Sequence, residues 1–177
     1  AIVPKLEVHV ISPIENRYYG LEPSKAEPMF AEALQIVLQG LRGGKLTFKG
    51  EFYNFENVPI ELEPYQKPHP PLWYGVNSPS NAQRTGERGM NAVANAPAAV
   101  IRGMGETYWP AAAKAGMRAP RLGMNRHIVI AEDREVALEA ARRAYRVWFA
   151  SFMKVWRENN TPPVGVNYPE EIDGFIA

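Results

Sequence analysis

The sequence predicts an α/β fold in which buried parallel strands alternate with helices. One observation is the short apolar run from Leu72 to Val76, which has the length and composition of a strand covered on both faces. Another is the cluster of small hydrogen-bonding residues from Asn77 to Asn81, which opens a helical segment that ends at Arg88-Gly89. The third is the passage from Pro64 to Pro71, whose four prolines each hold φ at about −65° and keep the chain extended.

Two elements and a hairpin are predicted before this passage. The segment from Lys5 to Ile11 alternates apolar and polar residues as a strand does. A helix is expected from about Lys25 to Leu41, because its apolar residues recur at helical spacing. Residues 46–48 and 52–55 flank a turn that contains a glycine, which indicates a small β-hairpin.

After the helical segment that ends at Arg88-Gly89, strands and helices continue to alternate. Strands are expected over Asn91–Asn95 and Leu122–Ile130, with a helix over Gly103–Gly116 between them. The inward positions of that helix are expected to be Tyr108, Trp109 and Ala112. His127 lies in the second of these segments and is interpreted as structural.

The longest helix is expected from Arg134 to about Glu158, with Asp133 as its N-cap. Its apolar residues form a wide stripe that consists of Val136, Ala137, Ala140, Ala144, Val147, Trp148, Phe152 and Val155. An aromatic cluster on this helix either lines a substrate pocket or covers an outer helix layer or an interface. Its members are Trp148, Phe149, Phe152 and Trp156. The tail from Thr161 is irregular, with a final turn between Pro169 and Phe175.

Charge and cysteine content exclude several classes of protein. The 20 basic and 19 acidic residues leave a net charge of +1, too little to attract nucleic acid or an anionic membrane. The absence of cysteine excludes disulfides and thiolate chemistry and fits a reducing compartment. No apolar run approaches the roughly 18 residues of a spanning helix, and the first residues lack the order of a signal peptide. We therefore expect a cytoplasmic protein with no nucleic-acid or membrane partner.

The segment from Gly50 to Trp73 carries a motif of many unlike residues at fixed spacing. In this motif, and in the Arg88-Gly89 that closes the following helix, the chain resembles the bacterial luciferase-like flavin monooxygenase family. Weaker resemblance extends from about Leu6 to about Trp148. The residues that match are Gly50, Phe52, Tyr53, Phe55, Val58, Ile60, Pro64, Gln66, Pro68, His69, Pro70, Pro71, Leu72 and Trp73.

The resemblance implies a (β/α)8 TIM barrel, of which this chain holds only part. The predicted strands at Lys5–Ile11, Leu72–Val76, Asn91–Asn95 and Leu122–Ile130 would be barrel strands four to seven, with the hairpin as an insertion. A complete barrel needs about 250 residues, whereas this chain has 177. Residues 1–177 are therefore expected to form a single truncated luciferase-like domain, with an eighth strand missing or only begun near Val164. A natural truncation, a fragment of a longer product and a processed chain all remain open.

The best candidate site is the loop from Asn77 to Asn81, which we call the loop 77–81. It lies at the carboxyl end of a parallel strand, where amides of the next helix and the helix dipole favour an anion. The resemblance places Ser78 where relatives have a serine that contacts the flavin phosphate. The cofactor-binding residues are then expected to be Asn77, Ser78, Ser80 and Asn81. The alternative is that Ser-Pro-Ser-Asn is an ordinary N-cap and turn.

Other candidates are weaker, and the catalytic residues stay unassigned. His69 lies between prolines before a strand, at the end of the barrel opposite an active site. Three scattered histidines make no metal signature. Trp73 and Tyr74 stack on a flavin or belong to the core. The arginines that could hold a phosphate, but are solvated surface by default, are Arg102, Arg118, Arg121 and Arg126.

The chain also departs from the family. Many relatives have a glycine-rich turn with an arginine after the fourth strand, whereas residues 11–15 contain neither. Barrel strands one to three have no counterpart. We therefore expect the 177-residue chain by itself to lack monooxygenase turnover, and to self-associate because an incomplete barrel exposes sheet edges.

The resemblance implies that a small organic molecule is oxygenated by O₂ and reduced FMN. A separate flavin reductase would supply the reduced FMN. A deazaflavin-dependent oxidoreductase of the same fold is the first alternative. A catalytically inactive truncated barrel, acting as a scaffold or as a homo-oligomer, is the second.

Overall fold

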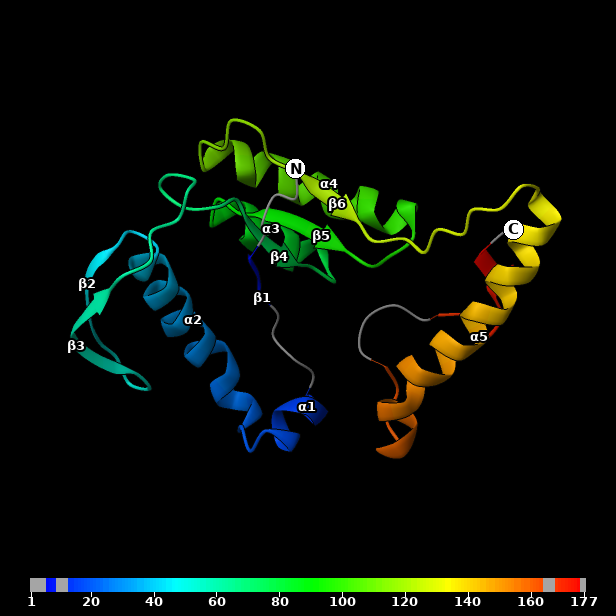
Figure 1. Cartoon of the computed structure of the whole chain (residues 1–177), viewed down its shortest axis with the longest axis horizontal. Helices are drawn as coiled ribbons and strands as arrows, with labels where there is room; N and C mark the ends of the chain where they lie inside the picture. The colour runs from blue at the N-terminus through cyan, green and yellow to red at the C-terminus, as the bar shows by residue number, and fades with distance from the viewer. Residues whose placement is uncertain (1–5, 9–12, 164–167, 176–177) are drawn as a thin grey trace.

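The computed structural model describes residues 6–8, 13–163 and 168–175. Its centre is a four-stranded parallel sheet in the order β1-β4-β5-β6 (Figure 1). The strands are β1 (Leu6–Val8), β4 (Leu72–Gly75), β5 (Asn91–Ala94) and β6 (Leu122–Met124). Parallel neighbours need a crossover connection, and the helices α3 (Pro79–Glu87) and α4 (Ala98–Lys114) provide two of them. The predicted alternation of strands and helices is confirmed.

The register of the sheet separates its two faces. Ala92 pairs with Leu122 on the face that packs against α3 and α4. Val93 pairs with Gly123 on the opposite face, where a methyl group on Gly123 would lie 3.2 Å from the Trp73 ring. This second face corresponds to the interior of the predicted barrel. The core lies on the helix side and consists of Val76, Ala82, Ala92, Ala94, Ala96, Ile101, Met104, Tyr108 and Ala112.

A buried asparagine ties the amino ends of three strands together. Asn91 donates a hydrogen bond from Nδ2 to the Leu72 carbonyl at 3.2 Å. Its Oδ1 accepts one from the backbone N–H of Arg121 at 3.0 Å. Both polar atoms of this buried amide are therefore satisfied by the backbone of the strands on either side.

Helices α3 and α4 approach each other backbone to backbone at Gly86. A methyl group on Gly86 would lie 2.9 Å from the backbone N of Ala112 and 2.9 Å from the carbonyl O of Tyr108. The Tyr108 ring is fully buried, and its hydroxyl donates to the Met90 carbonyl at 3.2 Å. This contact joins α4 to the residue that leads into β5, so the two helices and the sheet form one packed unit.

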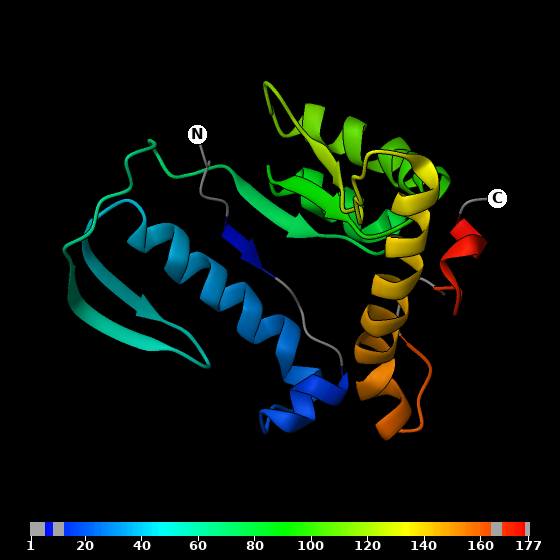
Figure 2. The same ribbon diagram turned by 45° about the vertical axis from the view of Figure 1, so that its right-hand side comes forward.

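An arm is inserted between β1 and β4. It consists of α1 (Pro13–Tyr18), α2 (Pro23–Gly40) and an antiparallel hairpin of β2 (Gly44–Lys49) and β3 (Asn54–Ile60). Figures 1 and 2 show the hairpin and α5 (Arg134–Glu158) on opposite sides of the central sheet. The expected helix and hairpin are thus confirmed.

One carboxylate joins α2 to the hairpin. Glu32 accepts hydrogen bonds from the backbone N–H groups of Glu51, Phe52 and Tyr53 at 2.7, 3.0 and 3.1 Å. A side chain at Gly50 would overlap this carboxylate and would displace it from the turn. Desolvation acts to raise the pKa of Glu32, but the three hydrogen bonds together outweigh it and hold the pKa below its ordinary value.

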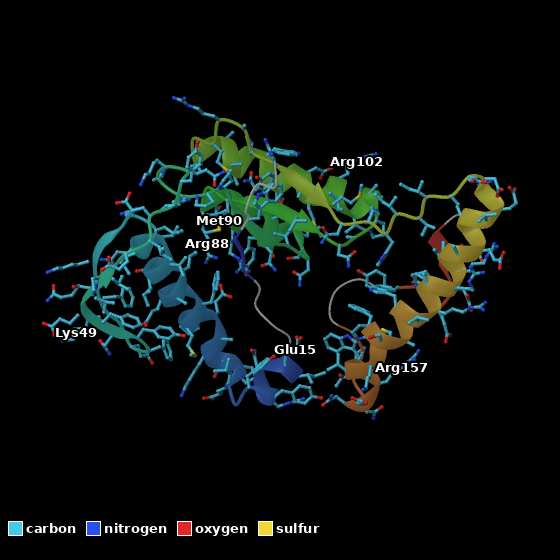
Figure 3. All side chains as sticks on the ribbon, viewed as in Figure 1. Glu15, Lys49, Arg88, Met90, Arg102 and Arg157 are labelled. Carbon is cyan, nitrogen blue, oxygen red and sulfur yellow. The ribbon has the colours of Figure 1, made fainter. Side chains whose placement is uncertain are left out.

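A second contact places α2 against the sheet. The Phe30 ring packs on Tyr74 of β4 with ring centroids 5.7 Å apart. Arg88, labelled in Figure 3, lies with its guanidinium 5.9 Å from the centroid of Phe30 and 3.8 Å from Glu27. Tyr74 therefore belongs to the helix-side packing, as the core interpretation expected.

Helix α5 follows β6, and its N-cap is as predicted. The Asp133 carboxylate accepts a hydrogen bond from the backbone N–H of Val136 at 2.8 Å. The C-terminal segment 168–175 runs back along this helix and ends in a 3₁₀ helix, Ile172–Phe175. Among the described residues, no helix combines the length and the apolar character that a membrane crossing requires.

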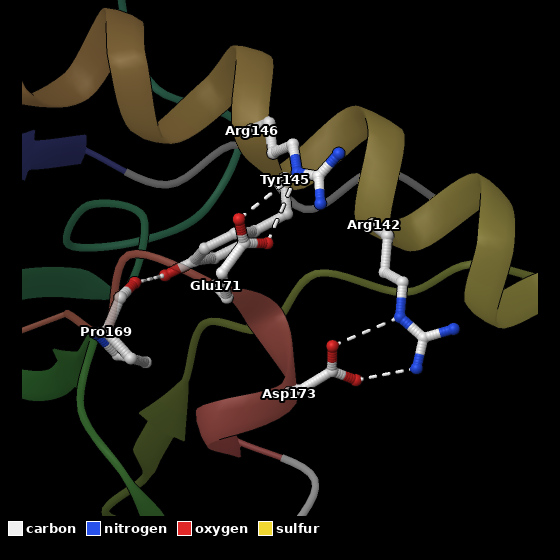
Figure 4. A network of polar contacts seen from close by, with 6 residues as sticks. All are labelled: Arg142, Tyr145, Arg146, Pro169, Glu171 and Asp173. Carbon is white, nitrogen blue, oxygen red and sulfur yellow. Dashed lines mark hydrogen bonds and ion pairs between the residues drawn. The ribbon is translucent and has the colours of Figure 1, made fainter.

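Four side-chain contacts hold this C-terminal segment against α5, and Figure 4 shows three of them. Arg142 donates two hydrogen bonds to the Asp173 carboxylate, at 2.8 and 3.1 Å. The bond from Arg142 lowers the pKa of Asp173. The other contacts are Arg146 to Glu171 at 3.2 Å, Arg157 to Glu170 at 4.0 Å, and the hydroxyl of Tyr145 to the Pro169 carbonyl at 2.6 Å.

Several sequence predictions are wrong in detail. Strand β6 ends at Met124 and does not reach Ile130, because its partner β5 ends at Ala94 and a strand extends only as far as its ladder. Helix α4 begins at Ala98, five residues before Gly103. Trp109 was expected to be buried, but it is 45% exposed. The buried residues of α4 recur at helical spacing and include Tyr108, and the next residue, Trp109, points away from that side of the helix.

The predicted stripe on α5 is also only partly buried. Val136 and Val147 are exposed, and the buried side chains of this helix are Tyr145, Phe149 and Trp156. The physical reason is that α5 packs mainly on the C-terminal segment, which covers a narrower face than the apolar stripe. His9 and the expected start of an eighth strand near Val164 lie outside the described residues.

Gly86→Ala is expected to lower the free energy of unfolding by roughly 1–3 kcal/mol, because the added methyl group must push α3 away from the α4 backbone. Gly103→Ala is the matched control. Gly103 is also helical, but nothing lies within 4 Å of its Cβ position. Its replacement is expected to raise the free energy of unfolding by about 0.5–1 kcal/mol. Urea titrations of both variants measure the difference, and equal responses would contradict the close contact at Gly86.

Glu32→Gln is expected to lower the melting temperature at neutral pH, because an amide loses the charge that three N–H groups stabilise. A carboxyl whose pKa is depressed on folding contributes stability above its ordinary pKa of 4.5 and loses it as the pH falls through the folded value. The variant should therefore lose less stability on acidification than the wild type. Glu106→Gln, in another helix and without a described partner, is the control and should leave both measurements unchanged.

Candidate functional site

The loop 77–81 follows β4 at the carboxyl end of the strand, and its last three residues form the first turn of α3. Ser78 is the N-cap of α3, and its Oγ accepts a hydrogen bond from the Asn81 N–H at 3.2 Å. The Ser80 hydroxyl lies 3.1 Å from the Ser78 hydroxyl, and the Asn81 side chain donates to Asn77 Oδ1 at 2.7 Å. The structure thus brings all four candidate residues together in one small loop.

The expected N-cap interpretation is correct, and it leaves room for a ligand. The bond between Ser78 and Ser80 uses the proton of only one of the two hydroxyls, so the other can be donated elsewhere. The side chain of Asn77 is exposed and retains its two N–H donors. The loop can therefore cap α3 and still offer neutral donors to an acceptor at its surface.

The electrostatics of the loop favour an anion. The first turn of α3 contains no acidic residue, and the helix N-terminus contributes partial positive charge. Arg84 donates a hydrogen bond to Asn81 Oδ1, which brings a guanidinium beside the loop. Sequence reasoning missed Arg84, although its spacing of three residues from Asn81 places both on one helix face.

The loops that follow β5 and β6 end at the same edge of the sheet. A cavity of about 360 Å³ lies between these strand ends and α5, and we call it the aromatic cavity. Its polar lining consists of Asn95, Asn125, Arg126 and His127. Its aromatic lining consists of Tyr145, Trp148 and Tyr168.

One of these polar residues is where the sequence suggested and one is not. Arg126 is exposed, as expected, and it also donates to the carbonyls of Asn125, at 2.7 Å, and Ala96, and so lies across the strand ends. His127 follows β6 and does not lie within a strand, and its ring packs edge-on against Trp148 with centroids 4.7 Å apart. The aromatic cluster of α5 contributes Trp148 to this cavity, as one of its two interpretations proposed.

The remaining candidates lie elsewhere. His69 precedes β4 at the opposite edge of the sheet, and its Nδ1 lies 2.8 Å from the Pro70 carbonyl. Trp73 lies on the barrel-interior face, over Gly123. No group of three or more histidine, aspartate or glutamate residues that could hold a metal ion occurs in the described part of the chain.

Comparison with known sequences identifies relatives over nearly the whole chain. The family model described as luciferase-like monooxygenase matches residues 10–173. The uncharacterized protein y4wF of Sinorhizobium fredii is 32% identical over 167 residues, which are 93% of this chain and 48% of that protein. The chain thus spans about half the length of this curated relative.

Three solved structures resemble the chain. Monooxygenase RslO1 from Streptomyces bottropensis has a TM-score of 0.67 and 19% identity over 89% of this chain and 52% of its own. The oxygenating constituent of 3,6-diketocamphane monooxygenase from Pseudomonas putida, in complex with FMN, has a TM-score of 0.66 and 18% identity, covering 88% and 48%. An F420-dependent secondary alcohol dehydrogenase has a TM-score of 0.62 and 20% identity, covering 83% and 46%. These likenesses confirm the predicted partial barrel.

Proposed function

The chain belongs to the luciferase-like monooxygenase family, and from this we propose that it forms part of a flavin-dependent monooxygenase that acts on a small organic molecule. The observation that carries the proposal is the loop 77–81, a donor-rich loop without acidic residues at the carboxyl edge of a parallel sheet. That edge is where barrels of this architecture bind their ligands.

The residues of the loop fit the phosphate of FMN. The hydroxyls of Ser78 and Ser80 and the exposed amide of Asn77 would donate to phosphate oxygens, while the α3 dipole and Arg84 supply positive charge. Trp73, on the barrel-interior face, offers aromatic surface to the ring system. The fit involves five residues from a single strand, loop and helix.

When bound, reduced FMN supplies the electrons that activate O₂ for transfer of one oxygen atom to the substrate. The work of this chain is to hold the phosphate, orient the ring and keep water from the reacting atoms. Since reduced FMN has to be delivered, the proposal includes a separate flavin reductase as partner.

A deazaflavin-dependent oxidoreductase is the alternative function. It is supported by the likeness to the F420-dependent alcohol dehydrogenase and to the coenzyme F420-dependent tetrahydromethanopterin reductase of Methanopyrus kandleri. Titration of the chain with FMN and with F420 separates the two functions, because each function requires tighter binding of its own cofactor. A chain that binds neither would support the scaffold interpretation instead.

Ser78→Asp is expected to weaken FMN binding by roughly tenfold or more, because its carboxylate would face the phosphate. Aspartate is as good an N-cap as serine, so the melting temperature should stay nearly unchanged. Ser78→Asn is the matched control, since it keeps a neutral cap and should weaken binding far less. Fluorescence titration with FMN measures the affinities.

Riboflavin tests, by a change in the ligand, whether the loop 77–81 binds the phosphate of FMN. It lacks the phosphate, so its affinity should be the same for the wild type and for Ser78→Asp. If both ligands lose affinity equally, or if neither does, the loop 77–81 does not hold the phosphate.

The proposal also includes self-association. The outer strands β1 and β6 have one unpaired side each in the described sheet, and soluble proteins rarely leave sheet edges open. Light scattering at micromolar concentration is expected to show a mass above that of the monomer. A stable monomer would argue against it.

A further inference from the structure

The aromatic cavity has walls that are held in place before any ligand arrives. Trp148 stacks on Phe152 with ring centroids 5.1 Å apart and planes inclined by 16°. Tyr168 packs edge-on against both rings, at 5.3 and 5.2 Å. Tyr145 adds a tilted contact to Trp148 at 5.3 Å. Rings that support one another in this way present a rigid apolar surface, which lowers the entropic cost of binding a flat molecule.

The C-terminal segment fixes one side of the cavity. Tyr168 donates its hydroxyl proton to the Asn95 carbonyl at 3.1 Å, across 73 residues of sequence. Burial raises the pKa of the Tyr168 phenol, against a smaller opposing effect of Arg126, so the ring carries no charge at neutral pH. The wall is therefore neutral and is tied directly to the loop after β5.

The charge of the cavity is positive. None of its lining residues is acidic, whereas Arg126 contributes a permanent cation and the side chains of Asn95 and Asn125 contribute N–H donors. The described residues include no carboxylate within ion-pair distance of Arg126. The acidic residues of the described C-terminal segment are Glu170, Glu171 and Asp173, and all three are paired with arginines of α5.

Arg126 also keeps donors for a ligand. Two of its N–H groups are used on the carbonyls of Asn125 and Ala96, which fixes the guanidinium at the strand ends. A guanidinium has five such groups, so three remain. A guanidinium can bind a carboxylate through two parallel N–H···O bonds, and a carboxylate, unlike a phosphate, is planar and can be conjugated to a flat ring.

We propose that the aromatic cavity binds a planar aromatic carboxylate, with its ring against Trp148 and Tyr168 and its carboxylate toward Arg126. A cavity of about 360 Å³ accommodates a molecule of one or two rings. The site shares no residue with the loop 77–81, so the proposal does not depend on flavin binding.

Calorimetric titration of the full chain with 2-naphthoate tests the proposal, with 2-naphthamide as its neutral counterpart. We expect naphthoate to bind at least roughly tenfold more tightly than naphthamide. Arg126→Gln should remove this preference by weakening naphthoate alone, whereas Trp148→Leu should weaken both ligands. Arg118→Gln, an exposed arginine outside the cavity, should change neither affinity.

Two further measurements keep the test independent of folding and of the flavin site. For the wild type, added salt should weaken naphthoate and leave naphthamide unaffected, which needs no variant. Ser78→Asp should bind naphthoate as the wild type does, whatever it does to FMN. Equal affinity for naphthoate and naphthamide, or no binding of either at millimolar concentration, would overturn the proposal.

Discussion

The close contact of α3 with α4 at Gly86 is the constraint on which the rest of the structure depends. Because the two helices meet backbone to backbone, α4 can bury Tyr108 completely and bond it to the residue before β5. Packing of this kind leaves little freedom to the strands that the helices connect. The ends of β4, β5 and β6 are therefore held side by side, and both candidate binding regions are built on these ends.

The two regions use this shared edge in different ways. The loop 77–81 is local, since one strand end and one helix turn supply its hydroxyls, amides and the neighbouring Arg84. The aromatic cavity is assembled from distant parts of the chain, with polar groups from the strand ends and rings from α5 and the C-terminal segment. A loop rich in hydrogen-bond donors and a cavity with aromatic walls, at ends of strands of one sheet, are what the two proposed ligands, a phosphate and an aromatic carboxylate, require.

The solved structures that the chain resembles are longer than the chain. The chain covers 46–52% of their length, and 83–89% of its own length takes part in the likeness. The arm between β1 and β4 is stabilised by contacts of its own, above all the three backbone hydrogen bonds to Glu32. A further contact, of Phe30 with Tyr74, joins the arm to the sheet.

The sequence by itself determined the order of the strands and of the helices other than α1, the hairpin, the Asp133 cap and the cap at Ser78, because these follow from local periodicity, proline and capping chemistry. Whether the loop 77–81 holds a phosphate is still a prediction. The sequence did not predict the end of β6 or the hydrogen bond from Arg126 to the Ala96 carbonyl, since each depends on a neighbour distant in the chain. Only the tertiary structure placed Tyr168 against Asn95 and closed the aromatic cavity, because contacts between residues 73 positions apart leave no periodic signal.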